Sequence, residues 1–102
     1  MSISAVVDNK ANTLEILIDG QFDFSCLEAF RRVYQGHREL DATYIVNLQS
    51  VEYMDSSALG MILLLKKHAE TNSGQVVLTS PNERVLKILN IASFEQLVSI
   101  VP

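Results

Sequence analysis

The run Tyr44-Ile45-Val46-Asn47-Leu48 constrains the fold most, because it is a short apolar strand pattern without a polar face. A strand of this kind is typical of a parallel sheet, in which other layers cover both faces. Parallel strands need long crossover connections, and segments with helical periodicity stand before and after this run. The sequence therefore predicts an α/β fold with residues 44–48 as a central strand.

Hydrophobic periodicity and capping signals predict the other elements. The predicted strands, the first two forming a hairpin, are Ile3–Val7, Thr13–Gly20, Tyr44–Leu48, Gln75–Thr79 and Leu97–Val101. The predicted helices are Ser25–Gly36, a second over Leu59–Glu70 with cap-favouring residues before it, and a third starting at Ser80-Pro81-Asn82-Glu83, with a helical turn at Ser93–Gln96. Ser25 with Glu28, and Ser80 with Glu83, have the spacing of capping boxes. The order is β-β-α-β-α-β-α-β, a single domain over residues 1–102 with a mixed, mostly parallel sheet covered by helices.

Composition excludes several classes of protein. With 48% hydrophobic and 20% charged residues among 102, the chain is not of the disordered type. A net charge of -4 argues against nucleic-acid binding, so we expect a protein partner. The N-terminus has no signal-peptide pattern, and the longest apolar run, 61–65, is too short to cross a bilayer. We expect a cytoplasmic protein without direct membrane contact.

The sequence offers little for catalysis or for cofactors. One cysteine, Cys26, and two histidines, His37 and His68, do not have zinc-site spacing, so no metal is expected. The four glycines stand singly and form no phosphate-binding loop, so no nucleotide cofactor is expected. A hydrolase built on Ser56 lacks a base placed by the sequence to activate the hydroxyl. We therefore expect a protein that is not an enzyme.

The segment Asp55-Ser56-Ser57 stands out because it places two hydroxyls at the start of a helix, directly after an apolar segment. Free N–H groups and the positive end of the helix dipole favour an anionic group there. Two interpretations remain open from local chemistry. Asp55 or Ser56 caps the helix and does nothing more, or a serine carries a phosphoryl group.

The stretch from Val46 to Gly60, with Met-Asp-Ser-Ser at its centre, resembles the signature of the STAS family, in particular bacterial anti-sigma factor antagonists. Gly20-Gln21-Phe22-Asp23 and the element order support the resemblance, which covers nearly the whole chain. It implies a partner-switching protein that, when unphosphorylated, binds an anti-sigma factor/serine kinase of the histidine-kinase-like ATPase fold. Phosphorylation of Ser56 would release it, a serine phosphatase would restore it, and Asp23 would be the acidic residue beside the site.

Two positions depart from the family pattern. The motif commonly has glycine where this chain has Ala58, and the central strand commonly has aspartate where this chain has Asn47. Alanine suits a helix better than glycine but would leave slightly less room for a partner backbone. Asn47 removes one negative charge near the site.

The predicted second helix has two apolar sides. Ala58, Ile62, Leu65 and Ala69 form an inward stripe, whereas Leu63 and Leu64 flank Lys67 on the outward side with Gly60. Either a neighbouring helix covers one of these leucines, or they form a patch for a partner. We expect the partner-binding residues to be Asp23, Asp55, Ser57, Gly60, Leu63 and Leu64. The alternative function is a STAS subunit of an ABC-type lipid transport complex.

Overall fold

The computed structural model describes residues 2–102 as one α/β domain, which confirms the predicted fold class. The strands are β1 (Ser2–Asp8), β2 (Thr13–Phe22), β3 (Thr43–Asn47), β4 (Val51–Met54), β5 (Gln75–Thr79) and β6 (Ser99–Val101). The helices are α1 (Leu27–Tyr34), α2 (Ser56–Thr71) and α3 (Glu83–Ile91), with short 3-10 helices η1 (Phe24–Cys26) and η2 (Phe94–Gln96).

The sheet has the strand order β1-β2-β3-β5-β6, with β4 pairing separately along β2. β1 is antiparallel to β2, and all other pairs are parallel. The central position expected for the 44–48 run is confirmed, because β3 lies between β2 and β5.

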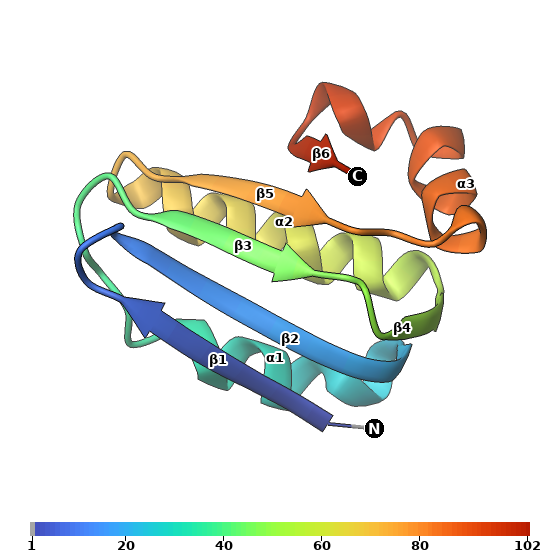
Figure 1. Cartoon of the computed structure of the whole chain (residues 1–102), viewed down its shortest axis with the longest axis horizontal. Coiled ribbons are helices and arrows are strands. Elements are labelled where there is room, and N and C mark those ends of the chain that lie inside the picture. The colour runs from blue at the N-terminus through green and yellow to red at the C-terminus, as the bar shows by residue number, and fades with distance from the viewer. Residues whose placement is uncertain (1) are drawn as a thin grey trace.

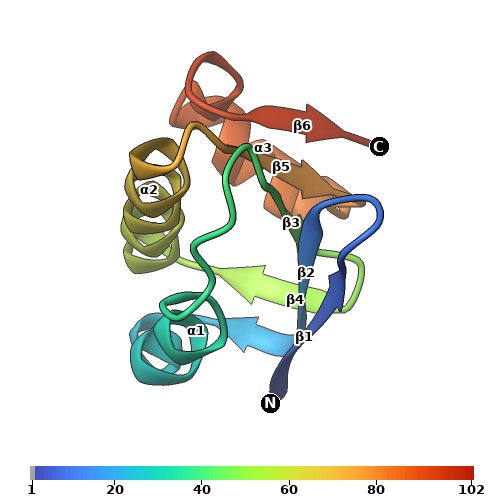
Figure 2. The same ribbon diagram turned by 90° about the vertical axis from the view of Figure 1, so that its left-hand side faces the viewer.

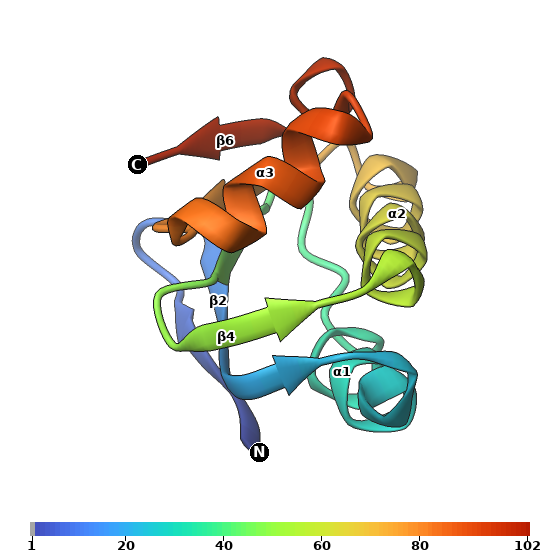
Figure 3. The same ribbon diagram turned by 90° about the vertical axis from the view of Figure 1, so that its right-hand side faces the viewer.

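The helices are distributed unevenly around the sheet. Figures 1 and 2 show α1 and α2 together on one face, and no helix formed by residues 2–102 lies on the opposite face of β1, β2, β3 and β5. Figure 3 shows α3 across the end of the sheet, between β4 and β6. Ile45 on the open face is only half-buried, so the expectation that both faces of this strand are covered is wrong for one face. None of the helices in residues 2–102 is long and apolar enough to span a bilayer.

The core forms where the helices meet the covered face of the sheet. Side chains of β2 alternate, with Leu14, Ile16 and Ile18 buried against the helices. Ile62 and Leu65 of α2 are fully buried on the other side of this layer. The core fixes the rotation of α2 about its axis, and this rotation decides which of its residues face outward.

Strand β4 is absent from the sequence prediction, which assigned no helix or strand to Val51–Met54. It pairs in parallel with the end of β2, with a register irregularity between Gly20 and Gln21. Its four residues are buried, exposed, exposed and buried, so they lack the alternation by which a half-buried strand is recognised.

Two predicted helix caps are also wrong. Asp23 rather than Ser25 caps the first helical segment, and that segment begins as a 3-10 turn before α1. Asn82 rather than Ser80 caps α3, accepting a hydrogen bond from the Val85 N–H at 2.8 Å. In both cases an Asp or Asn near the predicted cap serves instead, because its short side chain reaches the free N–H groups of the first turn.

Candidate functional site

The Asp55 and Asp23 turns lie next to each other, at the point where β4 and β2 end. Phe22 at the end of β2 and Met54 at the end of β4 are Cα partners. Asp23 follows Phe22 and Asp55 follows Met54, and each aspartate caps a helical segment. Figure 3 shows both strands ending side by side, where the segments leading into α1 and α2 begin. Strand pairing thus brings together two predicted site residues that are far apart in sequence.

The Asp55 carboxylate organises the start of α2. Its Oδ1 accepts hydrogen bonds from the Ser57 N–H at 3.0 Å, the Ala58 N–H at 3.3 Å and the Ser57 hydroxyl at 2.5 Å. These bonds, the Ser57 hydroxyl first among them, hold the pKa of Asp55 below its ordinary value. Asp55 is therefore the helix cap and a negative charge at neutral pH.

The two serines of the turn differ in their environment. The Ser57 hydroxyl is bonded to Asp55 and the residue is half-buried. Ser56, the first residue of α2, is exposed, and its hydroxyl makes no hydrogen bond to any residue in 2–102. The Ser56 hydroxyl is therefore the one that another molecule can reach without breaking an internal hydrogen bond.

The Asp23 turn repeats the geometry of the Asp55 turn. Asp23 Oδ1 accepts from the Ser25 N–H at 3.0 Å and from the Ser25 hydroxyl at 2.5 Å. The middle residue of this turn is Phe24, where the Asp55 turn has Ser56, and Phe24 is 68% exposed. Phe24 is not among the site residues predicted from the sequence. The sequence pattern that could have indicated Phe24 is Asp23-Phe24-Ser25, which matches Asp55-Ser56-Ser57 but has an apolar residue in the middle.

The outward face of α2 carries two exposed leucines. Ala58, Ile62, Leu65 and Ala69 are buried, as the inward stripe predicts. Leu63 and Leu64 are 40% and 52% exposed, so no neighbouring helix covers either of them. Gly60 is exposed between Ser56 and these leucines, and a Cβ at this position would meet nothing within 4 Å. Residues spaced three or four apart share a face, so Ser56, Gly60 and the two leucines form one surface, here called the α2 face.

The two departures from the family pattern have structural explanations. Ala58 is fully buried, so the expectation that it limits the approach of a partner is wrong. Asn47 donates to Glu15 Oε2 at 3.0 Å, and its Oδ1 accepts from the Gln49 N–H at 2.9 Å. An aspartate there would place a second carboxylate against Glu15. Asn47 pairs with Leu17, five residues before the end of β2, and its side chain bonds along the sheet rather than to either aspartate turn.

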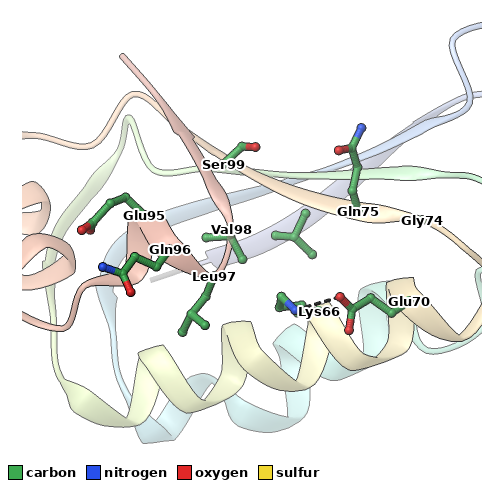
Figure 4. A pocket seen from close by; sticks show the side chains of 10 residues that line it. Lys66, Glu70, Gly74, Gln75, Glu95, Gln96, Leu97, Val98 and Ser99 are labelled. Carbon is green, nitrogen blue, oxygen red and sulfur yellow. Dashed lines mark hydrogen bonds and ion pairs between the residues drawn. The ribbon is translucent and has the colours of Figure 1, made fainter.

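The remaining candidates lie elsewhere. His68 Nε2 is 2.7 Å from the His37 carbonyl oxygen, and its ring packs edge-on against Tyr34 and Tyr44, so both histidines belong to the packing beneath α2. No group of three or more potential metal ligands is found within residues 2–102. A groove of about 320 Å³ lies between the second half of α2 and η2–β6, with the Lys66–Glu70 ion pair on one wall (Figure 4). It is several turns of helix away from Ser56.

The comparisons with known proteins agree on one family. The STAS domain model matches residues 4–102. A STAS-domain containing protein of Pseudomonas aeruginosa is 41% identical over 98% of this chain and 99% of its own length. The anti-sigma-B factor antagonist of Bacillus subtilis is 25% identical over 98% of this chain and 92% of its own. The anti-sigma factor antagonist SpoIIAA, in its unphosphorylated form, shares the fold with a TM-score of 0.69 at 20% identity, covering 99% of this chain and 87% of its own. A structure of SpoIIAA in the phosphorylated form matches with the same TM-score.

Proposed function

The chain belongs to the STAS domain family, and from this premise we propose that it is an anti-sigma factor antagonist whose binding is controlled by phosphorylation of Ser56. The observation that carries the proposal is the Asp55 turn, which leaves the Ser56 hydroxyl exposed beside the apolar α2 face. Relatives named anti-sigma factor antagonists, one of them solved with and without phosphate, support it.

In the unphosphorylated state, the α2 face and the two aspartate turns bind an anti-sigma factor/serine kinase of the histidine-kinase-like ATPase fold. Leu63 and Leu64 supply apolar area that is desolvated on binding. Gly60 allows the partner backbone to approach, which gives a reason for a residue that costs about 1 kcal/mol of helix propensity and has open space around it. Asp23, Asp55 and Ser57 shape the polar end of this surface.

The kinase transfers the γ-phosphoryl group of ATP to Ser56 Oγ, releasing ADP and the hydroxyl proton. The product carries about -1.5 to -2 charges next to the carboxylates of Asp23 and Asp55. The N-terminus of α2 tolerates this anion within the chain, but at an interface like charges brought together cost several kcal/mol, and each 1.4 kcal/mol is tenfold in affinity. The partner is therefore released, and a cytoplasmic serine phosphatase hydrolyses the phosphoester to restore binding. The chain is a substrate of both enzymes and has no catalytic role.

The first prediction compares Ser56 with Ser57, because the Ser56 hydroxyl is exposed and the Ser57 hydroxyl is bonded to Asp55. Ser56→Ala should abolish phosphate uptake and leave a protein that binds constitutively, since alanine removes the acceptor oxygen and adds no charge. Ser57→Ala is the matched control and should still be phosphorylated. Intact-mass analysis after incubation with each candidate kinase and ATP, followed by phosphopeptide mapping, makes the measurement.

Three results would contradict the proposal in different ways. Phosphate on Ser57 would overturn the choice of residue. Equal affinity of wild type and Ser56→Asp for the kinase would argue against charge as the switch, although one carboxylate carries less charge than a phosphate. Binding to a transporter ATPase, with no phosphate on either serine, would favour the transport-subunit alternative.

A further inference from the structure

We propose that Phe24 is an aromatic anchor of the partner-binding surface, inserting into an apolar pocket of the kinase that is rimmed by hydrogen-bond donors. This inference rests on the function proposed above and adds a residue and a partner chemistry to it. It starts from the juxtaposition of two equivalent turns, one holding Ser56 and the other holding Phe24 at the same position.

The register of the strands places the Asp23 turn, which holds Phe24, next to the Asp55 turn, which holds Ser56. Phe22 and Met54 are Cα partners. Each is followed by an Asp-x-Ser turn, and the middle residue is Phe24 in one turn and Ser56 in the other. The two aspartates cap their segments through the same pair of hydrogen bonds, to the N–H and the hydroxyl of a serine two residues on. A partner that binds at the Asp55 turn therefore lies next to the Asp23 turn, which carries the exposed Phe24 ring.

The Phe24 ring is exposed, yet its backbone is held on both sides. Phe22 and Cys26, two residues before and after, are fully buried. The Asp23 carbonyl oxygen accepts from the Cys26 N–H at 2.9 Å, which closes the turn. An aromatic side chain on a fixed turn loses little conformational freedom on binding, and such side chains are over-represented among interface residues that dominate affinity.

The carboxylates of Asp23 and Asp55 determine which groups a partner has to present. Asp23 and Asp55 use only Oδ1 for the side-chain hydrogen bonds that they accept within residues 2–102, which leaves the two Oδ2 atoms for donors on another molecule. Arg31, the first cation after Asp23 along the chain, is paired with Glu28 at 3.1 Å. A complementary partner therefore presents uncharged donors, such as backbone N–H groups, around the pocket that receives the ring.

The test uses the kinase found to phosphorylate Ser56 and the full chain. Phe24→Ala should weaken its binding to that kinase about 30-fold in Kd by titration calorimetry, as expected for a buried anchor. It should raise KM for phosphorylation of Ser56 and leave kcat unchanged, because the ring contributes binding and not chemistry. Phe24→Tyr should retain binding within about threefold, since it keeps the ring. Ile91→Ala, on α3 and 76% exposed, is the control for loss of an exposed apolar side chain.

The outcomes separate this inference from the proposed function. A kinase that binds wild type and Phe24→Ala equally, while Ser56 is still phosphorylated, would overturn the role of Phe24 and leave the proposed function standing. Equal losses for Phe24→Ala and Ile91→Ala would also overturn it. If no kinase phosphorylates or binds the wild-type chain, the proposed function fails and this inference fails with it. Thermal unfolding of each variant confirms that it is folded.

Discussion

The two glycines at opposite ends of α2, Gly74 and Gly60, differ in how much space surrounds them. At the C-terminal end, a Cβ at Gly74 would lie 2.3 Å from the Ala42 carbonyl oxygen, so the chain itself requires glycine there. The Gly74 N–H donates to the Ala69 carbonyl at 2.8 Å, which ties this turn to the last turn of the helix. At the N-terminal half, Gly60 has open space and two exposed leucines follow it.

The difference shows which features of α2 the fold explains. The turn at Gly74 is explained by backbone contacts between α2 and the start of β5. The α2 face is not explained by the fold, because glycine lowers helix stability and exposed leucine gains nothing from burial. Features that a domain retains against its own stability are expected where it binds something else. Substitutions at the two ends of α2 test this contrast.

Gly74→Ala should have the largest effect on stability. The added methyl group meets the Ala42 backbone rather than a flexible side chain, so the segment before β3 or the turn at Gly74 must shift, at a cost of about 2–3 kcal/mol. Urea unfolding measures the free energy. Gly36→Ala is the control, because a Cβ there meets nothing within 4 Å. A loss of less than about 0.5 kcal/mol would show that this end of the helix is not constrained by its glycine.

Leu63→Asp and Leu64→Asp should weaken partner binding more than folding. Exposed substitutions in a helix change stability by about 0.5–1 kcal/mol, whereas a charge in a desolvated interface costs a partner complex about 2 kcal/mol or more. Thermal unfolding and calorimetric titration on the same samples make the comparison. A collapse of the melting temperature in both variants would mean that these leucines support the core, which contradicts the proposed role of the α2 face.

Gly60→Ala should move stability and binding in opposite directions. Alanine should raise the free energy of unfolding by about 0.5–1 kcal/mol, since its methyl group enters open space and helix propensity improves. The same methyl group should weaken kinase binding by obstructing the partner backbone. Unfolding in urea and Kd are measured together, and unchanged affinity would remove Gly60 from the interface.

The smallest effect concerns the acid dependence of the Asp55 cap. The Ser57 hydroxyl bond lowers the pKa of Asp55 below 3.8, so the carboxylate stabilises the folded state above that pH. This contribution is lost as the pH falls through the lowered pKa. Wild type should therefore lose stability relative to Asp55→Asn, which keeps the cap but does not titrate. Urea unfolding from pH 6 to pH 2 checks this, and parallel curves for the two proteins would contradict it.

Much of the fold could be predicted because its signals are local. Alternation in β2, helical spacing in α2 and the apolar run at residues 44–48 each depend on neighbours within a few positions. The inward stripe of α2 was predicted for the same reason, since helix geometry fixes which residues share a face. The resemblance to the STAS family added the choice of Ser56 over Ser57 and the mention of Asp23. Their functional roles stay predictions.

The tertiary structure alone decided what lies next to what. Strand β4 has no pattern of its own and exists because it pairs with β2, and that pairing sets the Asp23 turn beside the Asp55 turn. From the sequence, Phe24 is one more apolar residue in a turn, and Asn47 one more polar residue in a strand. Only long-range contacts show that the turn holding Phe24 lies next to the turn holding Ser56, and that Asn47 bonds Glu15. Local chemistry sets the conformation of each segment, whereas contacts between distant segments depend on registers that no single segment encodes.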